Sequence, residues 1–217
     1  MEPNYRTVAK SASASFIEKK SEFIGHISPC KTEEEALDFI REIKKQHRKA
    51  THNCYAYILR SNNIGRHSDD GEPGGTAGAP MFEVLRKEGL TDVCCVVTRY
   101  FGGILLGAGG LVRAYTNGVK AAVDAAGIKE MRMAALIGIT LDYSLYGRLG
   151  SIFSDYDVRI RNEDFSSDVK INLYIDEKLT EEFKEKITDI CFGRVNIRVI
   201  EKTEFDFGKS GTDCSSE

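Results

Sequence analysis

The chain has 217 residues, of which 41% are hydrophobic and 29% are charged, as expected for a globular protein of one or two domains. It has no apolar run near the roughly 18 residues of a membrane helix and no apolar N-terminal signal core. Its six cysteines show no CxxC or framework spacing. Together these features indicate a cytoplasmic protein with reduced thiols. The net charge of −3 divides into +3 for residues 1–135 and −6 for residues 136–217, and neither value by itself demands a nucleic-acid partner.

The first elements predicted are two short strands, residues 14–17 and 23–28, joined by the turn EKKSE. A helix is expected from Thr32, because Glu35 three positions later completes a capping box. The basic residues near and beyond its end suit either RNA phosphates or a solvated face at the helix C-terminus, and we favour the solvated face. They are Arg41, Lys44, Lys45, Arg48 and Lys49.

Residues 52–59 alternate as a strand, which places His52 and Cys54 on one face. This pair is either a metal-ligand or catalytic Cys/His pair, or a core cysteine beside a hydrogen-bonded histidine. No further ligands occur at zinc spacing, so we interpret Cys54 and the other cysteines as structural.

A polar loop is predicted over residues 60–75, and it concentrates three carboxylates at Asp69, Asp70 and Glu72. Three carboxylates could hold Mg²⁺, but we favour a plain acidic turn stiffened by Pro73. A helix to residue 88, a buried strand over residues 93–100 and a helix over residues 111–126 should follow.

Residues 65–110 contain 11 of the 20 glycines, and the string FGGILLGAGG lies between the buried strand and the last of these helices. A strand, a glycine turn and a helix N-terminus together can bind an anion. The predicted anion or nucleic-acid site consists of Arg99, Gly102, Gly103, Gly107, Gly109, Gly110, Arg113 and Lys120. The alternative is structural: the glycines allow tight packing, and Arg99 pairs with one of the three carboxylates.

The rest of the chain reads as strand, helix, strand, strand, helix, strand, which is a ferredoxin-like βαββαβ pattern. We therefore predict an N-terminal domain over residues 1–133 with its core at 13–127, a ferredoxin-like domain over 134–207 and a flexible tail over 208–217. Residues 128–133 are expected to link the two domains.

Four segments in order resemble the YigZ/IMPACT family: KKSEFIGHISP, ATHNCYAY, SDDGEPGGTAG and VTRYFGGILLGAGGLVRAY. The resemblance is strong over about residues 13–127. It implies an α+β (α/β) protein with a unit like the second domain of ribosomal protein S5, followed by a ferredoxin-like unit. Eukaryotic members regulate a stress kinase through an extra N-terminal domain, whereas only a short polar arm precedes residue 13 here, so that role is not expected.

In this resemblance the ferredoxin-like unit is similar to the last domain of elongation factor G. That domain and the ribosomal protein S5 domain are both associated with the ribosome, so the resemblance implies RNA or ribosome contact. We predict a non-enzymatic cytoplasmic regulator of translation that binds RNA or the ribosome through its N-terminal domain, with no catalytic residue, metal or cofactor. A protein partner and the oligomeric state are left open, and no membrane partner is expected. The alternative is an enzyme acting on a phosphorylated small molecule or nucleotide bound at the glycine-rich loop 101–110.

Overall fold

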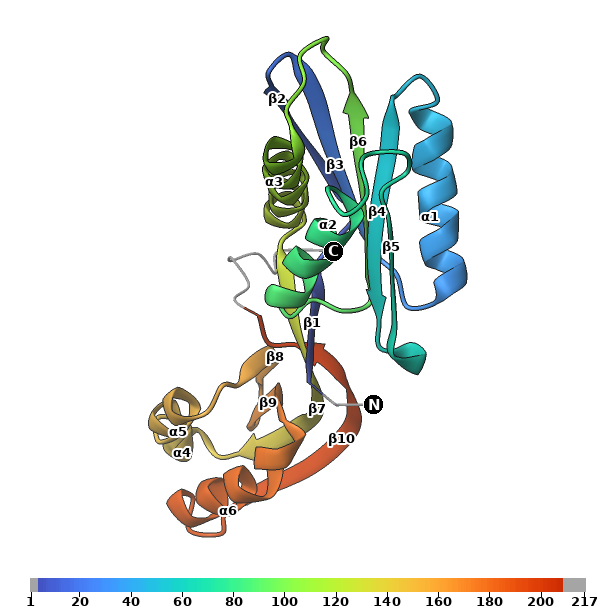
Figure 1. Ribbon diagram of the computed structural model, residues 1–217. Coiled ribbons are helices and arrows are strands. Elements are labelled where there is room, and N and C mark those ends of the chain that lie inside the picture. Colours follow the sequence, from blue (N-terminus) through green and yellow to red (C-terminus); the bar gives the residue numbers. More distant parts are fainter. Residues whose placement is uncertain (1–3, 209–217) are drawn as a thin grey trace. The chain divides into compact units, whose positions relative to one another are not determined.

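The computed structural model of the protein describes residues 4–208 and divides into two compact units, residues 1–129 and residues 130–217 (Figure 1). The sequence-based boundary at residue 133 lies close to this division. Of the tail predicted over residues 208–217, only Gly208 is described, and residues 209–217 lie outside the described residues. No helix among residues 4–208 is long and apolar enough to cross a membrane.

The N-terminal unit contains a five-stranded sheet in the order β2-β3-β6-β4-β5, with every neighbouring pair antiparallel. Three helices and a 3-10 turn at Ser61–Asn63 connect the strands. The elements are β1 (Tyr5–Val8), β2 (Ala12–Glu18), β3 (Ser21–Pro29), α1 (Glu33–Gln46), β4 (His52–Leu59), β5 (Ile64–Ser68), α2 (Gly78–Lys87), β6 (Val93–Tyr100) and α3 (Ala108–Ala126).

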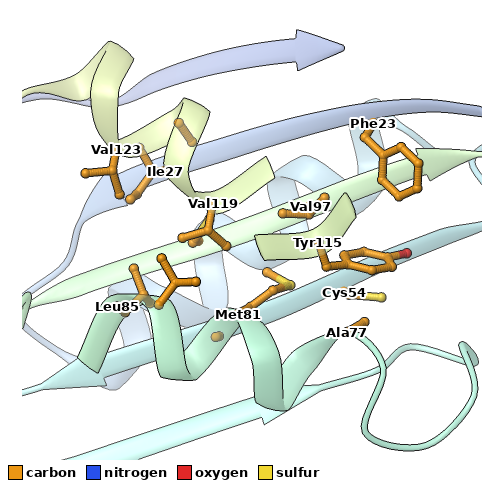
Figure 2. Close-up of a cluster of buried hydrophobic side chains, with 14 of the residues drawn as sticks. Phe23, Ile27, Cys54, Ala77, Met81, Leu85, Val97, Tyr115, Val119 and Val123 are labelled. Atoms are coloured by element: carbon orange, nitrogen blue, oxygen red, sulfur yellow. The ribbon is translucent and has the colours of Figure 1, made fainter. Parts of the chain in front are cut away.

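Helix α1 covers one face of this sheet, and α2 and α3 cover the other (Figure 1). Strand β4 serves both layers through the predicted alternation, because Cys54 and Ala56 pack with α2 and α3 while Tyr57 and Leu59 pack with α1. Figure 2 shows the layer between the sheet and helices α2 and α3. Two apolar layers hold the sheet from both sides.

The capping box predicted at the start of α1 is confirmed. The backbone N–H of Glu35 donates to the Thr32 hydroxyl at 3.2 Å, and the Thr32 N–H donates back to the Glu35 carboxylate at 3.3 Å. Two helix-end donors that lack intrahelical partners are thereby satisfied.

Helix α3 packs directly on β3 because a glycine on each side removes the side chains between them. A Cβ atom at Gly25 would lie 2.1 Å from the carbonyl oxygen of Gly118, and a Cβ at Gly118 would lie 3.0 Å from a methyl carbon of Val97. The middle of α3 is therefore held against β3 by a backbone-to-backbone contact.

We expect Gly25→Ala to lower the free energy of unfolding by about 1–3 kcal/mol, since α3 must move away to admit the methyl group. Urea denaturation of the full chain measures this change. Gly74→Ala is the matched control, because a Cβ there meets nothing within 4 Å. Equal stabilities of the two variants would contradict the close-packing account.

The polar loop predicted over residues 60–75 is wrong for its first half, where residues 64–68 form the edge strand β5 beside β4. Arg66 and His67 are polar and exposed and the strand has a single apolar side chain, Ile64, so it lacks the apolar alternation that identifies a strand. Helix α3 begins at Ala108, three residues before the predicted start at Leu111. The sequence places the start too late because Gly109 and Gly110 have low helix propensity.

The second unit confirms the βαββαβ pattern. Its antiparallel sheet has the order β10-β7-β9-β8, and its helices pack on one face around Leu149, Ile152, Phe183 and Ile187. The elements are β7 (Ile128–Leu141), α4 (Tyr143–Tyr146), α5 (Leu149–Asp155), β8 (Arg159–Phe165), β9 (Val169–Asp176), a 3-10 turn at Glu177–Leu179, α6 (Thr180–Ile190) and β10 (Val195–Asp206). The protein is thus an α+β protein of two units.

The linker predicted over residues 128–133 is wrong, because these residues form the first half of β7. There Met131 pairs with Asp206 and Arg132 pairs with Phe205 of β10. The partner strand lies more than 70 residues away along the chain, so no local pattern reveals this pairing.

Candidate functional site

The segment that joins β6 to α3, together with the first turn of that helix, contains the five glycines of the predicted site. A Cβ at Gly102 would lie 1.9 Å from the carbonyl oxygen of Lys20, so this glycine allows the segment to pack on the β2–β3 hairpin. Gly103 and Gly107 have φ values of 82° and 73°, which favour glycine. Gly109 and Gly110 lie in the first turn of α3.

The start of α3 offers backbone donors. Its N-cap is Gly107, so no side chain caps it, and its first turn contains no acidic residue. The first intrahelical bond runs from the Leu111 N–H to the Gly107 carbonyl at 2.9 Å, which leaves the amides of Ala108, Gly109 and Gly110 before it. These amides and the helix dipole favour a negative charge at this point.

Arg99, near the end of β6, is held in a buried ion pair. Its Nη1 donates to Glu72 at 2.7 Å, and the two side chains are 5% and 3% exposed. The Tyr115 hydroxyl donates to the same carboxylate oxygen at 2.7 Å, and burial is the main cause that raises the pKa of Tyr115 above its usual value. Of the three carboxylates considered as structural partners of Arg99, the structure therefore selects Glu72.

Arg113 and Lys120 lie on the exposed side of α3. Arg113 lines a hollow of about 100 Å³ with Lys19 and Gly110, whereas Arg99 lines a different pocket. The structure thus places the two arginines at separate hollows, and does not bring them together as the sequence suggests. Anion binding by either arginine stays a prediction.

The pocket at Arg99 has a volume of about 360 Å³. It lies where the start of α3, the end of β6, the first residues of β4 and the acidic turn meet, and most of its wall is apolar. The polar groups in that wall include His52, Glu72 and Arg99.

Hydrogen bonds to the carboxylates of the acidic turn hold its loop in place. Asp69 accepts hydrogen bonds from the amides of Gly75, Ala77 and Gly78, at 2.9, 3.0 and 2.8 Å. Although burial alone would raise the pKa of Asp69, these backbone hydrogen bonds lower it below its usual value. Asp70 accepts from the Lys44 ammonium at 2.6 Å and from the backbone N–H of Asn53 at 2.7 Å. Because Glu72 accepts from Arg99, all three carboxylates have hydrogen-bond donors within the N-terminal unit.

His52 and Cys54 are adjacent on β4, but each has its own backbone partner. The His52 Nδ1–H donates to the Asp70 carbonyl at 2.8 Å, and the Cys54 thiol donates to the Asp69 carbonyl at 2.9 Å. Burial raises the pKa of Cys54 to about 12, so the group is a neutral thiol near pH 7 and a poor nucleophile. These contacts agree with the structural interpretation of Cys54.

Two lysines beside the glycine turn were not predicted as site residues. Lys19 and Lys20 form the two-residue turn of the β2–β3 hairpin with φ values of 45° and 63°, and Lys20 carries the carbonyl that meets Gly102. Such turns favour Asn and Gly, so two lysines at these positions are a signal that could have identified them. Phe101 and Leu105, which are 46% and 82% exposed in the glycine turn, were not predicted either.

Comparison with known proteins places this arrangement in a family. Residues 19–123 match the Impact N-terminal domain, and residues 139–194 match a domain of unknown function, DUF1949. The matched segments fall in the N-terminal unit and in the second unit, respectively.

Several relatives match along most of this chain. IMPACT family member YvyE of Bacillus subtilis is 42% identical over 92% of this chain and 93% of its own length, and IMPACT family member YigZ of Escherichia coli is 33% identical over 85% and 92%. A crystal structure described as that of a hypothetical protein matches 93% of this chain and 99% of its own with a TM-score of 0.58 and 29% identity. On the agreement of both domain matches and of relatives spanning the chain, this protein belongs to the IMPACT family.

Proposed function

We propose that this protein is a cytoplasmic regulator of translation that binds RNA, free or in the ribosome, through its N-terminal unit. Membership of the IMPACT family supports a role in translation control. The proposal assigns binding, with no chemical step, to this unit.

The observation that carries the proposal is a group of exposed cations on the turn of the β2–β3 hairpin and on α3. We call Lys19, Lys20, Arg113 and Lys120 the cationic rim. Lys19 and Arg113 line one hollow, the Lys20 carbonyl packs on Gly102, and Lys120 lies two helical turns beyond Arg113 on the same side of α3. Exposed cations that are close together and reach one strand of phosphates release its counterions, which favours binding.

The neighbouring side chains suit single-stranded RNA. Phe101, in the turn that packs on Lys20, is 46% exposed and can stack on an unpaired base. Arg99 is excluded from the rim, because its charge is compensated by Glu72 inside the unit. RNA binding is therefore assigned to the surface charges and to Phe101.

The test removes rim charges without disturbing the hairpin. In Lys19→Asn/Lys20→Gly both new residues suit the positive φ of the turn, so the strands should keep their register. With a fluorescent single-stranded RNA as the probe, we expect about tenfold weaker binding, and a log–log salt slope reduced by roughly 0.7 for each phosphate that the variant no longer neutralises.

The matched control is Lys45→Gln/Arg48→Gln, which removes two exposed charges at the end of α1. We expect this double variant to bind the RNA as the unchanged protein does, in line with a solvated face there. Equal losses in both double variants would contradict a specific rim, as would unchanged binding by the hairpin variant.

A further inference from the structure

The pocket of about 360 Å³ at Arg99 is separate from the cationic rim, because none of the four rim residues lines it. Its wall joins two chemically different parts. One part is polar and consists of the start of α3 with Arg99, Glu72 and His52. The other part consists mainly of apolar side chains from the glycine turn. A ligand that fits both parts has a polar end and an apolar body.

The polar part carries unused hydrogen-bond donors. Ala108 lines the pocket, and its amide precedes the first intrahelical bond of α3, whose glycine N-cap has no side chain to accept from it. Independently, the Arg99 side chain is 5% exposed, lines the same pocket, and has an Nε atom that is buried without a hydrogen-bond partner in residues 4–208. A buried guanidinium donor left unpaired is costly, so an acceptor that reached it would be favourable.

The charge balance limits the ligand to one negative charge. Arg99 is already neutralised by Glu72, and the Glu72 oxygen that accepts from Arg99 also accepts from Tyr115. The remaining positive potential is the N-terminus of α3, equivalent to roughly half an elementary charge. A dianion beside the Glu72 carboxylate would be repelled, whereas a carboxylate can accept from the α3 amides and from Arg99.

An apolar ligand in this pocket would account for the exposed leucine in its wall. Leu105 is 82% exposed, yet it lines the pocket with Leu106, Pro73 and Phe101. An aliphatic or aromatic body in the pocket would remove this leucine and the Phe101 ring from water, which is favourable. The guanidinium of Arg99 lies 5.4 Å from the Phe101 ring centroid, so the polar and apolar parts are in contact.

We propose that this pocket binds a small organic monocarboxylate with an apolar body. The carboxylate accepts hydrogen bonds from the amides at the start of α3 and from Arg99, and the body packs on Leu105, Leu106 and Phe101. This goes beyond RNA binding and uses none of the four rim residues, although Phe101 is shared with the proposed RNA surface.

The test is an NMR titration of the full chain with hexanoate, with its neutral counterpart hexanamide, and with inorganic phosphate. We expect hexanoate to shift the amide resonances of Ala108, Gly109 and Gly110, hexanamide to leave them unchanged, and phosphate to bind at least about tenfold more weakly than hexanoate. Hexanoate leaving these amides unshifted, or hexanamide binding equally well, would overturn the proposal. Phosphate binding as tightly as hexanoate would overturn the assignment of an apolar body.

Two variants test the two parts of the pocket, one variant for each part, and neither changes the buried ion pair. Ala108→Pro deletes one amide donor at the first helical position, where proline is well tolerated, and should weaken hexanoate binding about tenfold. Leu105→Ser changes an exposed side chain and should weaken hexanoate binding several-fold while leaving phosphate unaffected. Unchanged hexanoate affinity in both variants would overturn the assigned contacts.

The rim variant Lys19→Asn/Lys20→Gly separates the two proposals. It should bind hexanoate as the unchanged protein does while losing affinity for RNA. Loss of hexanoate binding in this folded variant would contradict a pocket that is independent of the rim.

Discussion

Glu72→Ala is expected to lower the free energy of unfolding by about 3–5 kcal/mol, because it leaves Arg99 as an uncompensated buried charge. The two side chains are 5% and 3% exposed and are joined at 2.7 Å, so little water surrounds Arg99 to compensate for the lost carboxylate. The Tyr115 hydroxyl loses its acceptor in the same variant. Urea denaturation of the full chain, followed by circular dichroism, measures the change.

The matched control is Glu83→Ala, which breaks the ion pair of Glu83 with Arg86 on α2, where the two side chains are 44% and 64% exposed. Exposed pairs contribute about 0–1 kcal/mol, so this variant should stay close to the unchanged protein. The double variant Glu72→Ala/Arg99→Met should recover part of the loss, since it removes the stranded charge. Equal, small effects of Glu72→Ala and Glu83→Ala would show that the pair is not buried.

The second large effect is an expected loss of folding stability at acidic pH. Burial, with a smaller contribution from His47, lowers the pKa of His26 from 6.5 to about 4, and the two rings lie 4.9 Å apart. Between these pH values the unfolded chain binds a proton at His26 that the folded chain does not, so stability falls as the pH drops from 6.5 towards 4. The full difference amounts to about 3 kcal/mol at 1.36 kcal/mol per pH unit.

Urea midpoints at pH 7 and pH 4.5 measure this dependence. His26→Gln cannot titrate and should lose less stability between the two pH values than the unchanged protein, whereas His67→Gln, at an exposed histidine, should behave as the unchanged protein. An identical loss in the His26 variant and the unchanged protein would assign the acid sensitivity to other groups.

Much of the fold could be predicted because it depends on local signals. Thr32 and Glu35 define the start of α1, the alternation of residues 52–59 assigns both faces of β4, and Gly127 ends α3 as expected. These features depend on residues within one or two turns of each other. Strand β5 and the first half of β7 were not predicted, because their stability comes from partner strands rather than from their own pattern.

The candidate site could be predicted only in part. The glycine density correctly indicated close backbone approach at Gly102 and a helix start with free amides. The pairing of Arg99 with Glu72 depends on how β6 and the acidic turn meet, so the sequence could offer three carboxylates without choosing one. Similarly, the proximity of Lys19 to Arg113 depends on the packing of the β2–β3 hairpin beside α3.

Cosedimentation with ribosomes tests RNA binding by the cationic rim most directly. The purified chain is centrifuged with ribosomes at low and high salt, before and after RNase treatment, beside Lys19→Asn/Lys20→Gly and the α1 variant Lys45→Gln/Arg48→Gln. We expect the unchanged protein and the α1 variant to pellet with ribosomes at low salt, and the rim variant to stay in the supernatant. RNase or high salt should release the bound protein. Equal sedimentation of all three proteins would contradict RNA binding by the rim, and no sedimentation of any of them at low salt would contradict binding to the ribosome.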